Sequence, residues 1–394
     1  MGEIMRAPGP LVCVVGARPN YMKMAPLVRA LAQTPGLPGI VLVHTGQHYD
    51  IAMNARLFAD LELPAPDINL EVGSGTHAVQ TAEVMRRFDP IVAEMNPSAV
   101  IVVGDVNSTL ACTLVASKRR APVAHVEAGL RSFDRDMPEE INRLLTDQIA
   151  DLLYTTERDA ATNLAREGVA AERIHFAGNV MIDSLRRHLP RAVPPADTLV
   201  AAGVSPRVLD APEGFGTVTL HRPSNVDSPD ALGEALDILR DVSVRLPLVW
   251  PVHPRTLANI ERFGFAEMLA ATRVTLLPPQ GYLEMLGLLA GARLVVTDSG
   301  GIQEETTALA VPCLTMRDNT ERPITVSQGT NTLVGRDRAR MADAVDDIVR
   351  TGGKRGRVPE LWDGRAAERI AEHLAQWLPM RAVLPARTSI EALP

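Results

Sequence analysis

Residues 298–301, Asp-Ser-Gly-Gly, have the types and the spacing of an anion-binding turn. They follow the apolar run Leu294–Thr297, which predicts a buried parallel strand, and a helical pattern begins at Ile302. Small residues between a strand and a helix let the backbone approach a phosphate, whose charge the free N–H groups and the helix dipole favour. Glu304 and Glu305 lie in the first helical turn. An acid there either offsets the dipole, which the spacing alone favours, or accepts hydrogen bonds from a ribose diol.

Four side chains suited to proton transfer stand near the ends of other predicted elements. Asp105 follows a strand through a glycine, where capping of the next helix is a common role. Glu127 ends a strand, where a carboxylate is costly unless it faces a polar cleft. Glu139 begins a helix, where acids are favoured in any case, and a strand-end histidine such as His221 is as often structural as functional. Glu127 is therefore the hardest of the four to explain as a structural residue.

Two cations flank the turn after the first predicted strand and could meet a substrate phosphate. Arg18 stands at the strand end, one residue before a proline, whereas Lys23 lies on the following helix, where a lysine is commonly just solvated. The formal net charge of −7 gives no general attraction for nucleic acid or an anionic membrane, and an aromatic content of 4% argues against a stacking platform for single-stranded nucleic acid. An anionic substrate must therefore be met by a local basic cluster.

These residues must be positioned by a chain of 394 residues, which is too long for one ordinary core. Short apolar runs alternate with helical patterns, which predicts an α/β fold with doubly wound parallel sheets and ligands at the carboxyl ends of the strands. We expect an N-terminal Rossmann-like domain over 1–188, a C-terminal one over 189–365, and a C-terminal helix with a tail over 366–394 that crosses back. The Pro-, Ala- and Arg-rich stretch Leu185–Glu213 would connect the domains.

The predicted strands are Leu11–Val15, Ile40–Thr45, Val100–Val103, Val123–Val126, Leu152–Thr155, Ile174–Ala177, Thr217–Leu220, Leu248–Val252, Val274–Leu277, Leu294–Thr297, Pro312–Met316 and Thr332–Gly335.

Composition and spacing also argue against several classes of protein. Cys13, Cys112 and Cys313 lie in or beside apolar runs, so we expect buried free thiols and neither a disulfide framework nor a metal site. No stretch approaches the ~20 apolar residues of a membrane helix and none near the N-terminus has signal length, so we expect a cytoplasmic protein. No GxGxxG follows the first strand, which argues against a nicotinamide, and we expect neither a cofactor nor a metal.

Three segments carry a family resemblance: DSGGIQEE (298–305), MRDNTERP (316–323) and HVEAGLRSFDRDMPEEINR (125–143). Together they resemble the non-hydrolysing UDP-N-acetylglucosamine 2-epimerases, over roughly Leu11 to Arg350. The resemblance implies two doubly wound Rossmann-like domains that face a cleft, an architecture of the glycosyltransferase-B type. The catalytic residues that it implies are Asp105, Glu127, Glu139 and His221. The residues that it implies for binding the substrate or UDP are Arg18, Lys23, Arg143, Ser299, Gly300, Gly301, Glu305 and Arg322, with the Ser-Gly-Gly turn on the diphosphate and Glu305 on the ribose.

The reaction of that family explains why several acids and cations would share a cleft. Inverting carbon 2 of an N-acetylhexosamine breaks a C–H bond that is barely acidic. The resemblance implies that UDP departs through an oxocarbenium-like state to leave 2-acetamidoglucal, that one carboxylate removes the carbon-2 proton, and that a second group returns a proton from the opposite face. Each group must then serve as acid and base with a pKa raised towards neutrality, and side-chain cations would meet the departing UDP.

The sequence leaves the substrate and the reaction class open. Leu130 and Ser132 favour an epimerase that interconverts UDP-GlcNAc and UDP-ManNAc, because the uronate enzymes of the family differ around those positions. A modified sugar such as a UDP-diacetamido-hexuronic acid and a glycosyltransferase of the same architecture are the alternatives. A hydrolysing epimerase is less favoured because the HVEAGLRS segment is present, and a nucleotide-sugar-binding protein without catalysis is less favoured because the candidate acids are intact.

Regulation and assembly are also open at this level. Gln47 and His253 match parts of a regulatory pocket of the bacterial enzymes, but the stretch Glu71–Gly75 lacks the arginine of that pocket. Pro223 and Ser224 stand where many bacterial members carry a basic and an acidic residue. Activation by a second substrate molecule therefore stays open. We expect a homodimer that serves polysaccharide biosynthesis.

Overall fold

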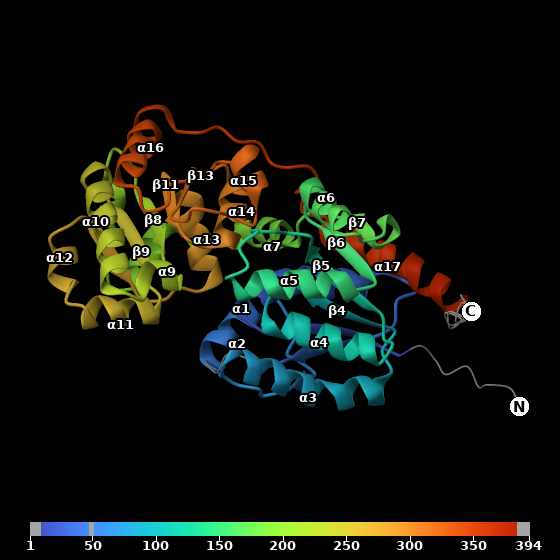
Figure 1. Cartoon of the computed structure of the whole chain (residues 1–394). Coiled ribbons are helices and arrows are strands. Elements are labelled where there is room, and N and C mark those ends of the chain that lie inside the picture. The colour runs from blue at the N-terminus through green and yellow to red at the C-terminus, as the bar shows by residue number, and fades with distance from the viewer. Residues whose placement is uncertain (1–8, 47–50, 384–394) are drawn as a thin grey trace, which may run out of the picture.

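The computed structural model of the protein describes residues 9–46 and 51–383 (Figure 1). The first half contains a sheet of seven parallel strands in the order β3-β2-β1-β4-β5-β6-β7. These strands are β1 (Leu11–Val15), β2 (Ile40–His44), β3 (Ile68–Asn69), β4 (Ala99–Val103), β5 (Val123–Ala128), β6 (Leu152–Thr155) and β7 (Ile174–Phe176). The order reverses between β1 and β4, so the carboxyl ends of these central strands border the crevice where ligands bind in such sheets.

The second half contains a sheet of six parallel strands in the order β10-β9-β8-β11-β12-β13. These strands are β8 (Gly216–Thr219), β9 (Leu248–Pro251), β10 (Val274–Leu277), β11 (Leu294–Thr297), β12 (Cys313–Thr315) and β13 (Asn331–Leu333). Its order reverses between β8 and β11, which places the turn after β11 at the second crevice.

Helices cover both sheets and connect their strands (Figure 1). In the first half they are α1 (Arg18–Gln33), α2 (Ile51–Asp60), α3 (His77–Met95), α4 (Asn107–Lys118), α5 (Pro138–Ile149), α6 (Arg158–Arg166), η1 (Ala171–Arg173) and α7 (Val180–His188). The passage between the sheets contains η2 (Leu189–Arg191), α8 (Pro195–Ala201) and η3 (Pro206–Asp210). The second half adds α9 (Pro223–Val226), α10 (Pro229–Arg245), α11 (Pro254–Arg262), α12 (Ala266–Ala270), α13 (Tyr282–Gly291), α14 (Gly300–Leu309), α15 (Pro323–Ser327), α16 (Arg338–Thr351) and α17 (Ala366–Val383).

The strands form because short aliphatic runs are buried on both faces, as parallel strands require. In β1 every residue is buried: Leu11, Cys13 and Val15 enter one core, and Val12 and Val14 enter the core on the opposite face. This alternation is the two-residue period of a strand. The predicted α/β class with two parallel sheets is confirmed, and so is the prediction of three buried free thiols at Cys13, Cys112 and Cys313.

Each strand predicted from the sequence is present, with ends within about two residues of the prediction. The edge strand β3 was not predicted, because a segment of two residues is too short to show an alternation of apolar and polar residues. None of the helices in the described ranges is long and apolar enough to cross a membrane.

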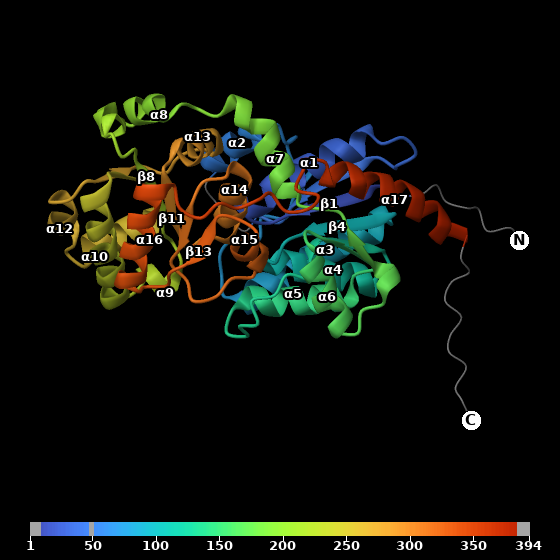
Figure 2. The same cartoon turned by 90° about the horizontal axis from the view of Figure 1, so that it is seen from above.

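The C-terminal helix α17 packs against α1 and α7 of the first half (Figure 2). Its apolar residues Ile370, Ala371 and Leu374 are fully buried in the core on that side of the first sheet. Its first turn is held by the Asp183 carboxylate of α7, which accepts hydrogen bonds from the backbone N–H groups of Ala366 and Ala367 at 3.1 and 2.7 Å. The 353–365 segment therefore carries the chain from the second sheet back to the first.

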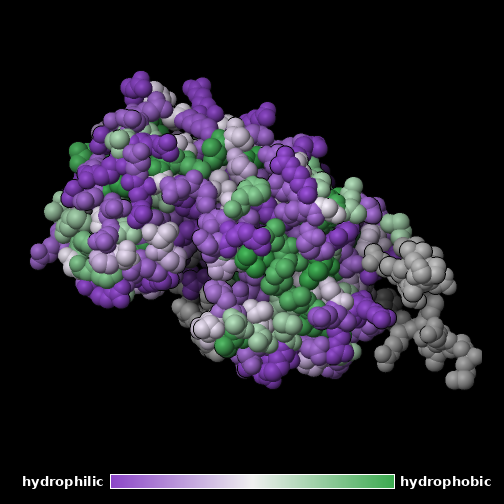
Figure 3. Space-filling view, in the orientation of Figure 1, coloured by the Kyte–Doolittle hydropathy of each residue, from purple (hydrophilic) through white to green (hydrophobic). Residues whose placement is uncertain are grey.

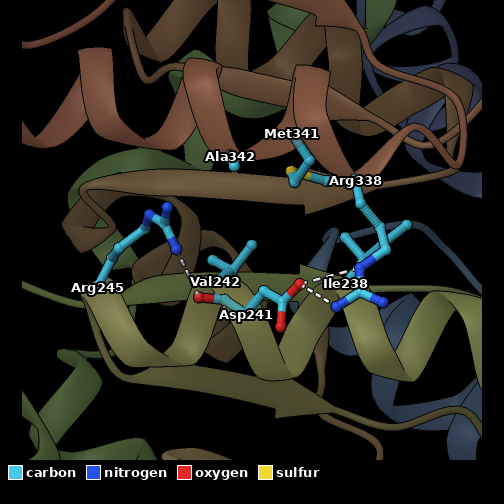
Figure 4. Close-up of a pocket in the computed structure, with 7 residues that line it drawn as sticks. All are labelled: Ile238, Asp241, Val242, Arg245, Arg338, Met341 and Ala342. Atoms are coloured by element: carbon cyan, nitrogen blue, oxygen red, sulfur yellow. Dashed lines mark hydrogen bonds and ion pairs between the residues drawn. The ribbon is translucent and has the colours of Figure 1, made fainter.

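Two surface features lie away from the crevices. Polar contacts cross a shallow depression between α10 and α16 (Figure 4). Arg338 donates to the Asp241 carboxylate, and the Arg245 guanidinium donates to the Asp241 backbone oxygen. Hydrophobic side chains gather over α4 and α5, where Leu145 and Ile149 are 48% and 38% exposed (Figure 3). The first feature is a packed helix contact, and the second is an apolar surface.

Candidate active site

Glu127 lies near the carboxyl end of β5, at an irregularity in the register between β5 and β6. Its backbone φ is +73°, a left-handed conformation that costs a non-glycine residue roughly 1–2 kcal/mol. Gly129 follows with φ +79°, and a Cβ added there would overlap the backbone oxygen of Ala160 on α6, so only glycine fits. Such strain persists where the surroundings over-determine the conformation, commonly at functional sites. The bend aims an almost fully buried carboxylate, 3% exposed, towards the second half of the molecule.

Two cations hold this carboxylate from opposite halves of the chain. The Lys23 Nζ atom of α1 lies 2.5 Å from Glu127 Oε2, and both side chains are buried. The Arg322 Nη2 atom, from the loop before α15, lies 2.9 Å from Glu127 Oε1. The carboxylate is therefore the point at which charged groups of both sheets meet.

The Arg322 guanidinium uses its three nitrogens on three carboxylates. Besides Glu127, its Nε lies 3.0 Å from Glu304 Oε1 and its Nη1 lies 2.5 Å from Glu321 Oε1. Burial alone would lower the pKa of Arg322, but Glu304, Glu321 and Glu127 raise it well above its ordinary value. Glu321 is in turn held by Arg317 Nη2 at 2.8 Å, and although burial opposes its charge, Arg322 and Arg317 hold its pKa well below the ordinary value. The fork geometry of arginine makes this three-way contact possible.

Asp105 and Arg143 form a second charged pair at the carboxyl end of the first sheet. Arg143 Nη1 contacts Asp105 Oδ2, and its Nη2 lies 2.6 Å from the buried Glu140 carboxylate. Burial opposes the charge on Arg143, but Asp105 and Glu140 raise its pKa. Glu140 also accepts hydrogen bonds from the N–H groups of Ser132 and Phe133, each at 3.0 Å, so it anchors the loop after β5.

Glu139, one residue before this anchor, is half-buried, and its charge acts on Arg222 of the second half. Arg222 also donates a hydrogen bond from Nε to the Asp298 backbone oxygen at 2.9 Å. Glu139 thus faces the second half from the start of α5, whereas its neighbour Glu140 serves the loop beneath it.

His221 follows β8 and is oriented by Asp298, the first residue after β11. Its Nδ1 atom lies 3.1 Å from Asp298 Oδ1, and its backbone N–H donates to the same carboxylate. Asp298 is fully buried; burial would raise its pKa, but the hydrogen bonds and charge of His221 and its other partners lower it. Asn225 Nδ2 also donates to Asp298 Oδ2 at 3.1 Å. The imidazole is 46% exposed, so its other edge faces open space.

The glycine turn opens α14 directly after Asp298. Ser299 is half-buried and Gly300 is buried. A Cβ added at Gly300 would overlap Arg322 Nη1 and Glu321 Oε1, so the backbone approaches the charged cluster as closely as only glycine permits. A Cβ at Gly301 would lie 2.8 Å from Met181 Cε of α7. The N–H groups at this helix start suit an anion.

Glu304 and Glu305 lie in the second turn of α14 and not, as predicted, in the first, because the helix begins at Gly300 and not at Ile302. The two acids have different surroundings. Glu304 is fully buried and also accepts a hydrogen bond from Asn179 Nδ2 at 2.9 Å. Glu305 is 3% exposed and accepts a hydrogen bond from the Tyr282 hydroxyl at 3.2 Å. Burial, and then the charge of Glu304, raises the pKa of Glu305 to about 7. Its role towards a ribose stays a prediction.

Comparison with known proteins identifies the family. A family model described as UDP-N-acetylglucosamine 2-epimerase matches residues 29–375. The chain belongs to this family. It is 39% identical over 367 residues to the UDP-N-acetylglucosamine 2-epimerase of Methanocaldococcus jannaschii, a match that covers 92% of this chain and 98% of that protein. The family resemblance found in the sequence is therefore confirmed.

Two further comparisons bear on the fold and the substrate. The chain is 40% identical over 378 residues, 93% of it and 99% of the relative, to the UDP-2,3-diacetamido-2,3-dideoxy-D-glucuronate 2-epimerase of Pseudomonas aeruginosa. A crystal structure of the M. jannaschii UDP-GlcNAc 2-epimerase in complex with UDP-GlcNAc and UDP matches with a TM-score of 0.81 and 37% identity, over 93% of this chain and 99% of that one. The two facing sheets are thus the glycosyltransferase-B-like fold of a nucleotide-sugar 2-epimerase.

In this epimerase-family chain, the predicted residues fall into three groups. The structure brings Lys23, Glu127 and Arg322 into direct contact, joins Asp105 to Arg143, and sets His221 beside the Ser299 turn. Arg18 is half-buried at the first turn of α1. Of the two residues matched to a regulatory pocket, Gln47 lies outside the described residues, and His253 caps α11 with its ring centroid 6.3 Å from that of His221.

The sequence analysis singled out neither Arg317 nor Glu321, and it named Glu304 and Asp298 without predicting their places in the charged cluster. Glu304, Arg317 and Glu321 lie inside the quoted DSGGIQEE and MRDNTERP segments, and Asp298 is the first residue of the former. Their places in those motifs were the available signal. Glu157, whose buried carboxyl interacts with Glu304, Arg322 and Glu127, belongs to none of the motifs.

Proposed function

We propose that this protein interconverts UDP-GlcNAc and UDP-ManNAc by eliminating UDP to 2-acetamidoglucal and adding it back. The observation that supports the proposal best is Glu127, a buried carboxylate aimed out of a strained strand end at the point where the two halves meet. A carboxylate at this boundary between the two halves suits removal and return of the carbon-2 proton. Lys23 and Arg322 lie against it, so a departing diphosphate would meet cations within a few ångströms of the base.

The other groups take roles that follow from their surroundings. Asp105, paired with Arg143, and Glu139, which faces the second half, are the candidates for a second acid–base group on the opposite face of the sugar. His221, oriented by Asp298, would donate to UDP as it leaves, and the Ser299 turn would hold the diphosphate. Arg18, at the first turn of α1, is assigned to the substrate phosphates as well.

The charge balance of the cluster favours a sugar without its own carboxylate. Arg143 already contacts Asp105 and Glu140, and Arg322 contacts three carboxylates. A uronate would bring one more negative charge to a site whose central arginines are engaged by acids, at an electrostatic cost in a buried environment. Leu130 and Ser132 favour the same choice on sequence grounds.

The second candidate substrate is a UDP-diacetamido-hexuronic acid, because the 40% identical P. aeruginosa relative is named as an epimerase for such a sugar. One experiment separates the two candidates and tests the reaction. The protein is incubated in deuterated water with each UDP-sugar in turn, and the products are followed by proton NMR.

We expect deuterium at carbon 2 of both UDP-GlcNAc and UDP-ManNAc, and little turnover of the uronate. Faster exchange into the uronate would replace the proposed substrate. Steady release of free ManNAc would assign a hydrolysing reaction instead, and no exchange into any UDP-sugar would refute epimerisation.

Assembly and location stay predictions at this point, and activation by a second substrate molecule stays open. For the expected homodimer, the exposed Leu145 and Ile149 on α5 are the first surface to test, by sedimentation of the wild type and of a variant with both changed to serine. We also infer a cytoplasmic location and a role in polysaccharide biosynthesis.

A further inference from the structure

Glu157 is a buried acid for which neither the fold nor the proposed reaction yet gives a use. It stands between β6 and α6 as the N-cap residue of α6, yet its side chain accepts no capping hydrogen bond. Its side chain is buried, with the residue only 2% exposed, and its Oε2 atom has no hydrogen-bond partner among the described residues. A buried carboxyl oxygen without a partner is costly, so it calls for an explanation.

Glu157 lies close to the segment that carries Arg322, because it lines one cavity together with Ile324 of α15, the helix whose N-cap residue is Arg322. The charges of Glu304, Arg322 and Glu127 all act on the Glu157 carboxyl, with that of Glu304 the strongest. Glu304 itself has one oxygen, Oε1, engaged by Arg322 and Asn179, while its Oε2 is buried and without a partner among the described residues. Two buried acids thus lie in the same electrostatic neighbourhood, and each leaves an oxygen unused.

A cavity of about 60 Å³ leads from Glu157 towards the surface. Its lining includes Ile324 of α15 and Gln328, the residue that follows this helix, together with the exposed Arg158, Asp159 and Glu360. The volume exceeds what one water molecule requires, and the lining is polar enough to hold water. Protons can therefore reach Glu157 from solvent through this cavity.

We propose that Glu157 holds a proton that it exchanges with solvent through this cavity, so that of these two acids Glu304 alone competes with Glu127 for the charge of Arg322. Glu157 is then a positioning residue for the epimerase reaction. The inference rests on the proposed function, in which Glu127 acts on the sugar. When Glu157 is protonated, only the negative charge of Glu304 competes with Glu127 for the Arg322 guanidinium. When Glu157 is charged as well, two negative charges compete and draw the guanidinium away from Glu127.

The surroundings of Glu157 support a protonated carboxyl at neutral pH. Burial first, and then the charge of Glu304, raises the pKa of Glu157 to about 8, with Arg322 opposing the rise. Asp159 on α6 and Glu127 on β5 add to the rise. Burial also raises the pKa of Glu304, against the effect of Arg322. At the cavity rim, Arg158 is neutralised by Glu360 at 2.6 Å, so among the described residues that line the cavity no unpaired cation favours the charged form of Glu157.

The test compares Glu157→Gln with a matched control, Asp159→Asn. Both remove one carboxyl from the lining of the same cavity, but the Glu157 side chain is buried whereas Asp159 is exposed. For wild type, kcat/KM for UDP-GlcNAc should fall by up to about tenfold per pH unit above pH ~8, as the second charge appears. The Gln variant is always neutral, so this alkaline fall should move up by at least about one pH unit. The Asn variant removes a smaller contribution to the raised pKa of Glu157, so it should move the alkaline fall slightly towards lower pH, opposite to the Gln variant.

A second measurement needs no activity and no change at Glu157. In a Glu305→Gln background, which removes another acid that titrates near neutrality, infrared spectra should show a protonated-carboxyl band that disappears with a midpoint near pH 8. A lowered rate with an unmoved pH profile in the Glu157 variant would overturn the inference, and so would the absence of that band. Failure of the deuterium experiment would instead overturn the proposed function and leave the infrared result to stand alone.

Discussion

The contact between Lys23 and Glu127 provides the sharpest test of how the site is held together. The two charged atoms are 2.5 Å apart, and the side chains are only 5% and 2% exposed. At an effective dielectric constant of ~20, two unit charges at this separation attract by about 7 kcal/mol. Part of that attraction offsets the cost of removing both ions from water. Removing one partner alone should therefore destabilise the protein by ~3–5 kcal/mol, because it leaves a buried charge uncompensated.

A double-mutant cycle isolates this interaction. The free energy of unfolding is measured by urea denaturation for wild type, Lys23→Met, Glu127→Gln and the double variant. We expect each single change to cost ~3–5 kcal/mol and the double variant to cost less than the sum by ~2–3 kcal/mol. Arg322 loses a partner in both proteins that carry Glu127→Gln, so the double variant should stay less stable than wild type.

An exposed ion pair is the matched control. Arg350 and Asp347 lie 3.3 Å apart with side chains 76% and 48% exposed, and the same cycle there should show no measurable coupling. If the changes at Lys23 and Glu127 add to within ~0.5 kcal/mol, the two charges do not depend on one another. The description of Lys23 as a cation that holds Glu127 in place would then be wrong.

Three further changes test the assigned roles. Glu127→Gln should lower kcat by ~10²-fold or more while UDP still binds in calorimetry. Asp298→Asn should lower kcat/KM by roughly tenfold or more and alter the pH profile, because His221 loses the acceptor that orients it. Glu305→Gln should weaken UDP binding by ~1.5–3 kcal/mol. The folded protein binds the Glu305 proton more tightly than the unfolded chain does. The free energy of unfolding of the wild type should therefore fall by roughly 3 kcal/mol between pH ~4.5 and 7. Thermal melts of the Glu305→Gln variant should not show this loss of stability.

The fold could be predicted from the sequence because its signals are local. Each buried strand is a short aliphatic run such as Leu11–Val15. The Asp-Ser-Gly-Gly sequence after such a run indicates a turn between a strand and a helix. The sequence also indicated that Glu127 is unusual, since a carboxylate at the end of a buried strand needs a polar neighbour. It could not show the φ of +73° at Glu127, which depends on the register irregularity between β5 and β6.

The partners of each acid are the part that local patterns could not supply. Glu127 and Arg322 are 195 positions apart in the chain, and Asn179 and Glu304 are 125 apart. No periodicity links such residues, because their contact follows from how the two sheets face one another. The conspicuous histidine of the HVEAGLRS segment illustrates the same limit: His125 is fully buried and bonds Asp147 at 2.7 Å, a structural role that its place in the motif did not reveal.

The charged cluster ties the docking of the two halves to the chemistry. Lys23 and Glu127 come from the first sheet, and Arg322 comes from the second, so the guanidinium both joins the halves and sets the charge beside the proposed base. A change at Arg322 should then alter the position of one half relative to the other and the acidity of the site together. A change at Glu157 should alter only the acidity of the site. Among the described residues, its carboxyl makes no hydrogen bond to Lys23 or Glu127. The comparison of those two variants therefore separates assembly of the site from control of its charge.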